Sequence, residues 1–286
     1  MIRHTTQLAM HDTLTLGFST CPNDTFIFHA LVHDVIDVRP FHFEAVLKDV
    51  EALNQDAARA RLDVSKLSFA ALGHVLDDYA LLRSGAALGR DCGPLIVARP
   101  GISLADLGRR RVAVPGRWTT ACLLLGLYMG QRPEAEAMTF DRIMPAVAEG
   151  RCDFGVIIHE GRFTYPQHGL VNLLDLGAWW EAQTGLPIPL GCIAVRRNLG
   201  PDGARKVEAM IRASVAYAFA HPRASQAYIR AHAQELAETV IRQHIELYVN
   251  EYTRDIGAQG EAAARLLLER ARRVGMVPDM ARPLFL

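Results

Sequence analysis

The chain has 286 residues, half of them hydrophobic, which is enough to bury a substantial core in one large domain or in two domains of ordinary size. It carries 31 basic and 31 acidic residues, so its formal net charge is zero and nothing indicates a nucleic-acid groove or a polybasic membrane surface. The five cysteines are widely spaced and include no C-x-x-C pair, which argues against a disulfide scaffold or zinc knuckle and favours a reducing compartment.

The N-terminal segment lacks the continuous apolar stretch of a secretion signal, and no apolar run elsewhere approaches the length of a membrane span. We therefore expect a cytoplasmic protein that acts without a membrane or nucleic acid. Residues 1 to about 12 are predicted to be a short disordered lead-in.

Strands and helices alternate through the first third of the chain. Runs of β-branched and apolar residues predict strands at 13–19, 41–47, 63–68, 79–83 and 94–98. The apolar pattern predicts helices at 25–32, 50–60 and 69–76, with Asp24 or Thr25 capping the first. This alternation predicts a mostly parallel sheet with helices packed on it.

The same pattern starts again near residue 111 and then gives way to helices. Strands are expected at 111–114, 153–158, 170–176 and 190–195, and helices at 119–129, closed by Gly130, and at 142–149. Four more helices follow, at 202–220, 224–233, 235–250 and 260–274. We expect an α/β fold of two lobes joined by two crossings. The larger lobe takes residues 1–95 and 196–286 and the smaller takes 96–195, with a cleft between them.

A histidine stands directly after the most strand-like segment of the second lobe. The run at 153–158 reads as a buried strand, and His159, Glu160 and Gly161 follow it. Ligands of open α/β sheets bind at the carboxyl ends of the strands, so His159 is a candidate acid or base. The alternative is a histidine that is merely satisfied by hydrogen bonds in a loop.

Polar side chains follow three other predicted strands. The turn before the helix at 119–129 would offer free backbone N–H groups to an anion such as a carboxylate, with the hydroxyls of Thr119 and Thr120 as further donors. A threonine that only caps the helix is the competing interpretation. Ser19, Asn23 and Asp24 follow the first strand, and Lys66 with Ser68 follows the third. Lys66 would neutralise an acidic ligand or project into solvent.

Other signals are weaker. His29 and His33 have helical metal-ligand spacing, but no third ligand is evident, so we predict no metal site. The sequence lacks G-x-G-x-x-G, Walker A and G-x-S-x-G motifs, and we expect no organic cofactor. Trp179 and Trp180 are expected to pack against the core, although they could close over an aromatic ligand.

Five segments in this order resemble one enzyme family: FSTCPNDTFIFHALV, KLSFAAL, VAVPGRWTTA, IIHEGRFTYPQHGL and DLGAWWEAQTGLPIPLG. The chain resembles the 1,4-dihydroxy-6-naphthoate synthase family of the futalosine route to menaquinone, over nearly its whole length. The resemblance implies a type II periplasmic-binding-protein-like fold, with the ligand in the cleft between the lobes. It also implies a carbon–carbon lyase that converts cyclic dehypoxanthinyl futalosine without metal or cofactor.

The site residues implied by the resemblance fall on three of these segments. His159 matches the proton acceptor. The family's substrate contacts, which bind an aromatic carboxylate, correspond to Lys66, Leu67, Ser68, Thr119, Thr120 and Ala121. Two alternatives stay open: chorismate dehydratase of the same pathway, and a carboxylate-binding protein that does no chemistry. The lack of a secretion signal counts against the binding protein.

Overall fold

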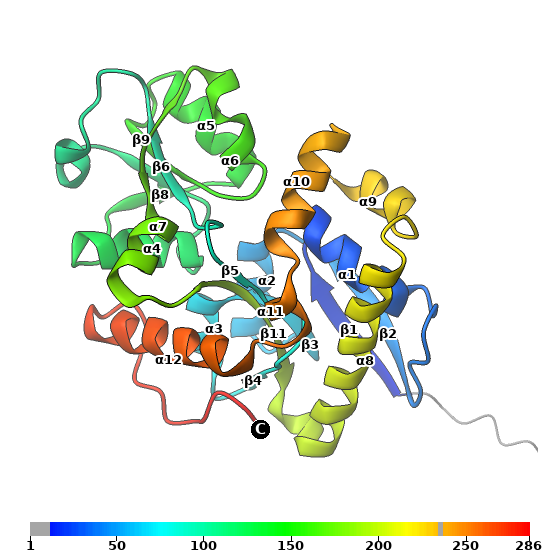
Figure 1. The fold of residues 1–286 in the computed structure, drawn as a ribbon. Helices are drawn as coiled ribbons and strands as arrows, with labels where there is room; N and C mark the ends of the chain where they lie inside the picture. The colour runs from blue at the N-terminus through cyan, green and yellow to red at the C-terminus, as the bar shows by residue number, and fades with distance from the viewer. Residues whose placement is uncertain (1–11, 234–236) are drawn as a thin grey trace, which may run out of the picture.

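The structure, a computed structural model, describes residues 12–233 and 237–286. The predicted lead-in therefore lies outside the described residues except for Asp12, which begins the first strand. The described residues form two lobes that stand side by side in Figure 1, each built on its own β-sheet. The α/β class and the two-lobed architecture are confirmed.

The first lobe is built on a sheet of order β2-β1-β3-β11-β4, with β5 also paired to β11. β1 runs parallel to β2 and β3, whereas β11 runs antiparallel to its three neighbours. The strand bounds are β1 Asp12–Phe18, β2 Phe41–Leu47, β3 Val64–Ser68, β4 Tyr79–Leu81, β5 Ala87–Gly89 and β11 Ile188–Arg196. Only β5, three residues in a glycine-bearing loop, was not predicted as a strand.

The second lobe is built on a sheet of order β10-β6-β9-β7-β8. β7 is parallel to β8 and β9, and β6 is antiparallel to β9 and β10. The bounds are β6 Leu95–Ala98, β7 Val112–Val114, β8 Ala135–Ala137, β9 Phe154–Ile157 and β10 Val171–Asp175. The short β8 was not predicted, because it contains no β-branched or aromatic residue.

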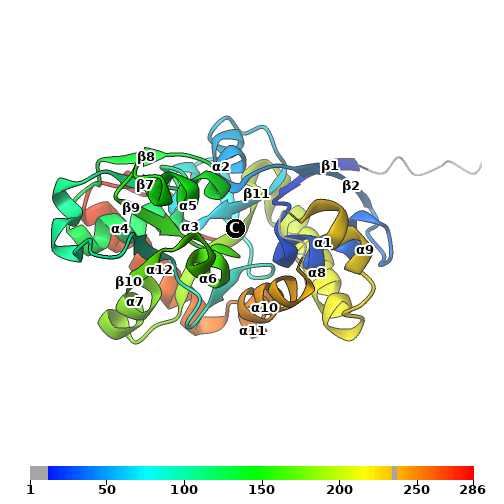
Figure 2. The same ribbon diagram turned by 90° about the horizontal axis from the view of Figure 1, so that it is seen from above.

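Helices cover both sheets (Figures 1 and 2). Those of the first half and the second lobe are α1 Pro22–Val32, α2 Val50–Ala58, α3 Phe69–Val75, α4 Thr120–Met129, α5 Phe140–Ala148, α6 Gly161–Thr164 and α7 Leu176–Thr184. The C-terminal helices are α8 Gly200–Ala220, α9 Gln226–His232, α10 Glu238–Tyr248, α11 Glu251–Arg254 and α12 Gly257–Arg273. Short 3-10 turns occupy Leu104–Arg109, Tyr165–His168 and Arg197–Leu199. The predicted start of the helix at 235–250 lies outside the described residues.

The start of α1 differs from the prediction. The helix begins at Pro22, and Cys21 occupies the N-cap position without a side-chain cap. Proline suits the first helical position because its fixed φ is already helical and its missing N–H is not needed there. Asp24 is therefore in the first turn and is free to take another role, so the prediction that Asp24 or Thr25 caps this helix was wrong. The end of α4 is as predicted, with Gly130 in the left-handed region at φ 69°.

The two connections between the lobes precede β6 and β11. β5 pairs within the first sheet and β6 within the second, and β11 returns to the first sheet. The division of the chain at residues 95 and 195 stays a prediction. Because β11 pairs with β3 and β4, we propose to place the second crossing before Ile188.

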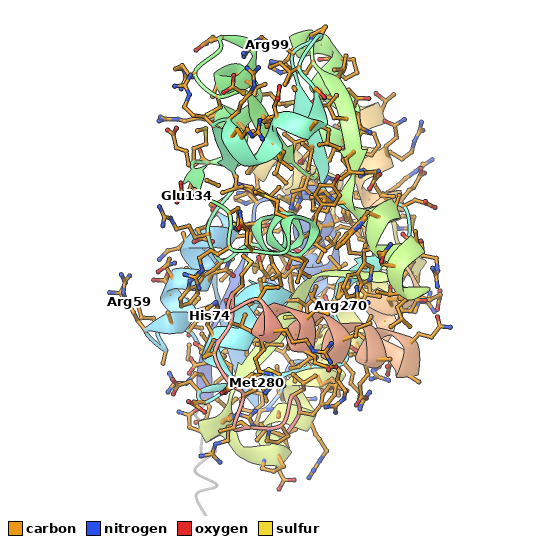
Figure 3. The ribbon with its side chains drawn as sticks, turned by 90° about the vertical axis from the view of Figure 1, so that its left-hand side faces the viewer. Arg59, His74, Arg99, Glu134, Arg270 and Met280 are labelled. Atoms are coloured by element: carbon orange, nitrogen blue, oxygen red, sulfur yellow. The ribbon has the colours of Figure 1, made fainter. Side chains whose placement is uncertain are left out.

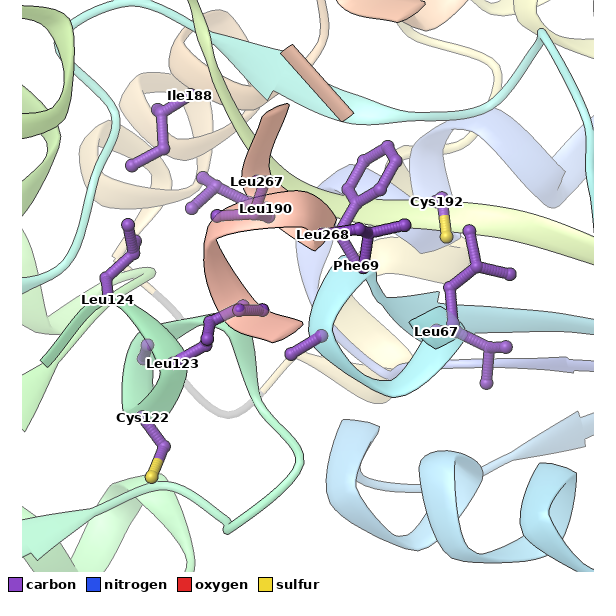
Figure 4. Packing of buried hydrophobic residues seen from close by; sticks show 14 of the residues in the cluster. Leu67, Phe69, Cys122, Leu123, Leu124, Ile188, Leu190, Cys192, Leu267 and Leu268 are labelled. Atoms are coloured by element: carbon purple, nitrogen blue, oxygen red, sulfur yellow. The ribbon is translucent and has the colours of Figure 1, made fainter. Parts of the chain in front are cut away.

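One apolar core extends through both lobes. Leu67 and Phe69 of the first lobe, Leu123 and Leu124 of α4, and Leu267 and Leu268 of α12 belong to it, and Figure 4 shows these side chains around α12. Figure 3 shows α12, which carries Arg270, lying across the junction between the lobes. In this view Arg99 is at one end of the molecule and Met280 lies toward the other. No helix in the two described ranges is both long and apolar enough to cross a membrane.

Candidate active site

Eight of the nine predicted site residues line a single cavity between the lobes. They are Ser19, Asn23, Lys66, Ser68, Thr119, Thr120, Ala121 and His159. The first four come from the ends of β1 and β3 and the start of α1, and the last four come from the second lobe. The folding of the chain thus brings together residues that lie up to 140 positions apart, from Ser19 to His159.

Leu67 is the exception. Its side chain is fully buried in the apolar core, as Figure 4 shows, and it does not line the cavity, whereas Lys66 and Ser68 do. Successive side chains of a strand point to opposite faces, so a three-residue segment of a strand places only its outer members in the cavity. The prediction that Leu67 contacts the ligand is therefore wrong for its side chain, which does not reach the cavity.

A buried ion pair forms the first-lobe wall of the cavity. The Lys66 ammonium donates to Asp24 Oδ1 at 2.6 Å, and the two side chains are 6% and 1% exposed. Asn23 Nδ2 donates to the same oxygen at 2.8 Å, and the Ser19 hydroxyl donates to Asp24 Oδ2 at 2.7 Å. Lys66 does not project into solvent. Buried charges require this kind of pairing, so Asp24 holds Lys66, Asn23 and Ser19 in place.

Gly191 on β11 makes room for the lysine. A Cβ at this position would lie 2.8 Å from Lys66 Cε. Any larger residue would therefore push the ammonium group out of its present place beside Asp24.

The start of α4 forms the second-lobe wall. The Thr119 hydroxyl accepts from the N–H of Cys122 and donates to the Gly116 carbonyl, while the Thr120 hydroxyl donates to the Leu190 carbonyl at 2.7 Å. Each threonine hydroxyl has one proton, and both protons are engaged within the protein. Thr119 thus caps the helix, as the competing interpretation held. The donors left at this helix end are the backbone N–H groups of Thr120 and Ala121, which have no intrahelical partner.

His159 has an unusual backbone. Its φ is 59°, in the left-handed region that residues other than glycine rarely adopt. Such conformations persist where the surrounding structure holds them, and they concentrate at functional sites. The Tyr248 hydroxyl accepts a hydrogen bond from the His159 N–H at 3.2 Å.

Aromatic rings enclose the His159 imidazole. Its centroid lies 5.4 Å from that of His244, 5.6 Å from Tyr248 and 6.2 Å from Phe140, with interplanar angles of 24° to 26°. Its Nδ1 atom is buried and has no hydrogen-bond partner among the described residues. Burial lowers the pKa of His159 to about 4, while Asp24 opposes this shift and Lys66 reinforces it. The ring is therefore neutral near pH 7, which leaves one nitrogen lone pair available, although the lowered pKa makes it a weaker base than a free imidazole.

A second histidine connects the two walls. His244 is fully buried, and its Nε2 lies 2.8 Å from Asn23 Oδ1. Its Nδ1 lies 3.6 Å from Glu160 Oε2, in the residue next to His159. Burial, followed by the nearby His159, lowers the pKa of His244 well below its ordinary value. Sequence reasoning missed His244 and Tyr248, because helical spacing of four residues is their only local signal and it is shared by most core helices.

Cys21 lies close to His159 and Glu160. Ligand atoms of Cys21, His159 and Glu160 lie within 4.8 Å of one another, so these three side chains could hold a metal ion after a small rearrangement. Burial, and then the Glu160 carboxylate, raise the pKa of the Cys21 thiol well above its usual value, so a metal would have to displace the thiol proton. His29 and His33 are not part of this group.

Trp180 and Trp179 are packing residues, as predicted. Trp180 is fully buried and its indole N–H donates to the Pro187 carbonyl at 3.1 Å. Trp179 meets Tyr128 edge to face, and neither tryptophan lines the cavity.

Comparison with known proteins shows the family of this chain. The menaquinone biosynthesis family matches residues 14–273. The chain belongs to this family. It is 52% identical to 1,4-dihydroxy-6-naphthoate synthase of Thermus thermophilus, covering 96% of this chain and 99% of that protein, and 48% identical to the enzyme of the same name from Streptomyces coelicolor, covering 94% and 96%. As a member of the family, this protein is an enzyme of menaquinone biosynthesis.

Solved structures confirm the fold. A protein of Archaeoglobus fulgidus superposes with a TM-score of 0.87 at 35% identity, covering 93% of this chain and 98% of that one. The periplasmic aliphatic sulphonate binding protein of Escherichia coli superposes with a TM-score of 0.66 at 14% identity, covering 94% and 89%. At that identity the likeness concerns the fold alone, which is the predicted periplasmic-binding-protein-like fold.

Proposed function

We propose that this family member is a carbon–carbon lyase that converts cyclic dehypoxanthinyl futalosine into 1,4-dihydroxy-6-naphthoate, with His159 as general base. The observation that carries the role of His159 is its place in the cavity, with a ring that burial keeps neutral. The identity to relatives named as this synthase supports the choice of reaction.

In this proposal the neutral imidazole takes a proton from the substrate as the carbon–carbon bond to its sugar-derived portion breaks. The imidazolium then returns that proton to the carbon that receives the bonding electron pair. A general base of this kind contributes about 10²–10⁴ in rate. Formation of the aromatic naphthalene ring favours the products, and positioning in the closed cavity supplies a further part of the rate.

The aromatic carboxylate is proposed to bind at the start of α4. The N–H groups of Thr120 and Ala121 and the positive end of the helix dipole favour an anion there. Lys66 lies in the opposite wall and adds positive charge, although Asp24 balances it. In this proposal these backbone N–H groups take the role that was predicted for the threonine hydroxyls.

The test is an anaerobic incubation of the protein with cyclic dehypoxanthinyl futalosine or with chorismate, followed by mass spectrometry. We expect dihydroxynaphthoate from the first substrate and no turnover of chorismate. His159→Asn should lower kcat by at least about 10², whereas His33→Asn, an exposed histidine outside the cavity, should keep wild-type turnover.

Three outcomes would contradict parts of the proposal. Dehydration of chorismate would assign the sister reaction, and binding without product would assign a binding protein. Wild-type turnover by His159→Asn, with unchanged substrate binding, would remove His159 from the role of base.

A further inference from the structure

Helix α10 belongs to the first lobe but contacts the second lobe at the candidate base. It packs against α1, and it lies beside α6 in both Figure 1 and Figure 2. His244 and Tyr248 are one helical turn apart, so they point from the same face of α10. Both side chains are buried, and both contact the segment formed by His159 and Glu160.

Tyr248 supports the backbone of His159. The hydrogen bond from the His159 N–H to the tyrosine hydroxyl is made at the residue whose φ is 59°. A positive φ at a non-glycine residue needs support from its surroundings, and this bond comes from the other lobe. The tyrosine ring also lies nearly parallel to the imidazole, at an interplanar angle of 26°.

His244 has a defined tautomer. Asn23 donates its amide N–H to Asp24, which sets the amide orientation, so its Oδ1 atom can only accept from His244. The proton of the neutral ring is therefore on Nε2, and the Nδ1 lone pair faces Glu160. Hydrogen bonds thus join the Lys66–Asp24 pair through Asn23 to His244, whose Nδ1 lies 3.6 Å from the carboxylate of the residue after His159.

We propose that Tyr248 and His244 are positioning residues of α10 that orient His159 when the two lobes are closed. This inference rests on the proposed function, in which His159 is the base. Neither side chain needs to exchange a proton with substrate. Tyr248 determines where the His159 backbone lies, and His244 confines the imidazole ring from the side, so α10 links the position of the base to lobe closure.

A purely structural role predicts a different result. If His244 and Tyr248 only filled the core, their replacement would lower stability but leave kcat of the folded protein intact. A positioning role predicts a lower kcat with little change in KM, because the carboxylate contacts at α4 and Lys66 are retained.

The first variant is Tyr248→Phe, which removes only the hydroxyl. Loss of one hydrogen bond that orients the base should lower kcat about tenfold, with KM within twofold of wild type. Tyr252→Phe is the matched control, since its hydroxyl bonds to Gln259 at an exposed position, and it should behave as wild type.

The second variant is His244→Gln. The glutamine amide can still donate to Asn23 but lacks the ring that faces His159, so kcat should again fall more than KM rises. Gln243→Ala, on the exposed side of α10, is its control. Wild-type kcat in both Tyr248→Phe and His244→Gln would overturn the inference while leaving the proposed function standing.

NMR of the His159 ring gives a readout that does not depend on turnover. The ring-proton shifts of His159 should move in Tyr248→Phe, which keeps the neighbouring aromatic ring, and stay in place in the two controls. If the wild-type protein does not turn over the substrate, the proposed function fails, and the shifts of Tyr248→Phe still decide whether α10 orients the ring. Unchanged shifts in Tyr248→Phe would overturn the inference.

Discussion

Two of the contacts between the lobes have opposite chemistry. At α12 the contact is apolar: Leu267 and Leu268 pack with Leu123 and Leu124 of the second lobe and with Phe69 of the first (Figure 4). At α10 the contact is polar and aromatic, between the pair His244 and Tyr248 and the segment at His159.

This difference shows which contact can open. Exposing one large apolar side chain costs about 1.5–3 kcal/mol, so several leucines at α12 hold that side of the junction together. A hydrogen bond exchanged for one to water has a net value of only about 0.5–1.5 kcal/mol. The α10 side can therefore separate while the α12 side stays packed.

The proposed ligand would need such a movement, because the cavity is small. Its volume of about 100 Å³ is below the roughly 150 Å³ of a cavity known to take benzene. The bicyclic aromatic acid of the proposed function would therefore enter only when the lobes separate, and closing them would restore the contact of α10 with His159.

The largest effect is expected at the apolar contact. Leu267→Ala should lower the free energy of unfolding by about 3 kcal/mol, because it removes buried methyl groups and leaves a cavity. Urea denaturation measures the change, and Ala262→Gln, at an exposed position of the same helix, should have almost no effect because glutamine is also a good helix former. A loss below about 1 kcal/mol in Leu267→Ala would show that α12 does not hold the junction.

The second-largest effect is expected from acid, which should weaken the polar contact at α10. An unfolded histidine has a pKa of about 6.5, whereas that of His159 is about 4 in the folded protein. The unfolded state therefore binds more protons in this interval, so stability is present above pH 6.5 and falls as the pH drops toward 4. The slope has an upper limit of about 1.4 kcal/mol per pH unit for each such histidine, and partial exposure of His159 to the cavity reduces its share.

Urea denaturation of the wild type and of His159→Asn at several pH values checks this assignment. The variant should have a shallower loss of stability between pH 6.5 and 4. An identical pH profile would mean that another group causes the loss. His244, whose pKa is also lowered, contributes to the slope that remains.

Tyr248→Phe should have a smaller effect on stability. Losing its hydrogen bond with His159 should cost about 1 kcal/mol, and small-angle scattering should detect a larger share of open molecules. Tyr252→Phe should change neither quantity. A loss as large as that of Leu267→Ala would contradict the distinction between the two contacts.

The smallest effect is expected at an exposed ion pair between the lobes. Arg90 follows β5 and contacts Glu181 of α7 at 3.3 Å, with 44% of the arginine side chain exposed. Arg90→Ala should cost no more than about 0.5 kcal/mol, and less in high salt. Urea denaturation at low and high salt provides the measurement. A loss above about 1 kcal/mol at both salt concentrations would show that this ion pair is an important part of the contact between the lobes.

Local patterns predicted most of the elements. The strand β2 and the glycine end of α4 were located to the residue, because alternating apolar residues and a left-handed glycine are local signals. The errors fall on β5 and β8, which contain no β-branched or aromatic residue, and on the start of α1, where proline displaces the expected cap. The prediction of a mostly parallel sheet was also wrong, because β11 returns from the second lobe and pairs antiparallel with β3, β4 and β5.

The sequence by itself determined the α/β class, the family and the segments that supply the cavity, because periodicity and motifs are properties of neighbouring residues. Only the tertiary structure decided that Leu67 points into the core, that the protons of Thr119 and Thr120 are used internally, and that Asp24 pairs with Lys66. It also brought His244 and Tyr248 of α10 against His159. These contacts join residues from both lobes, and hydrogen-bond direction and burial are defined only once those distant segments are packed together.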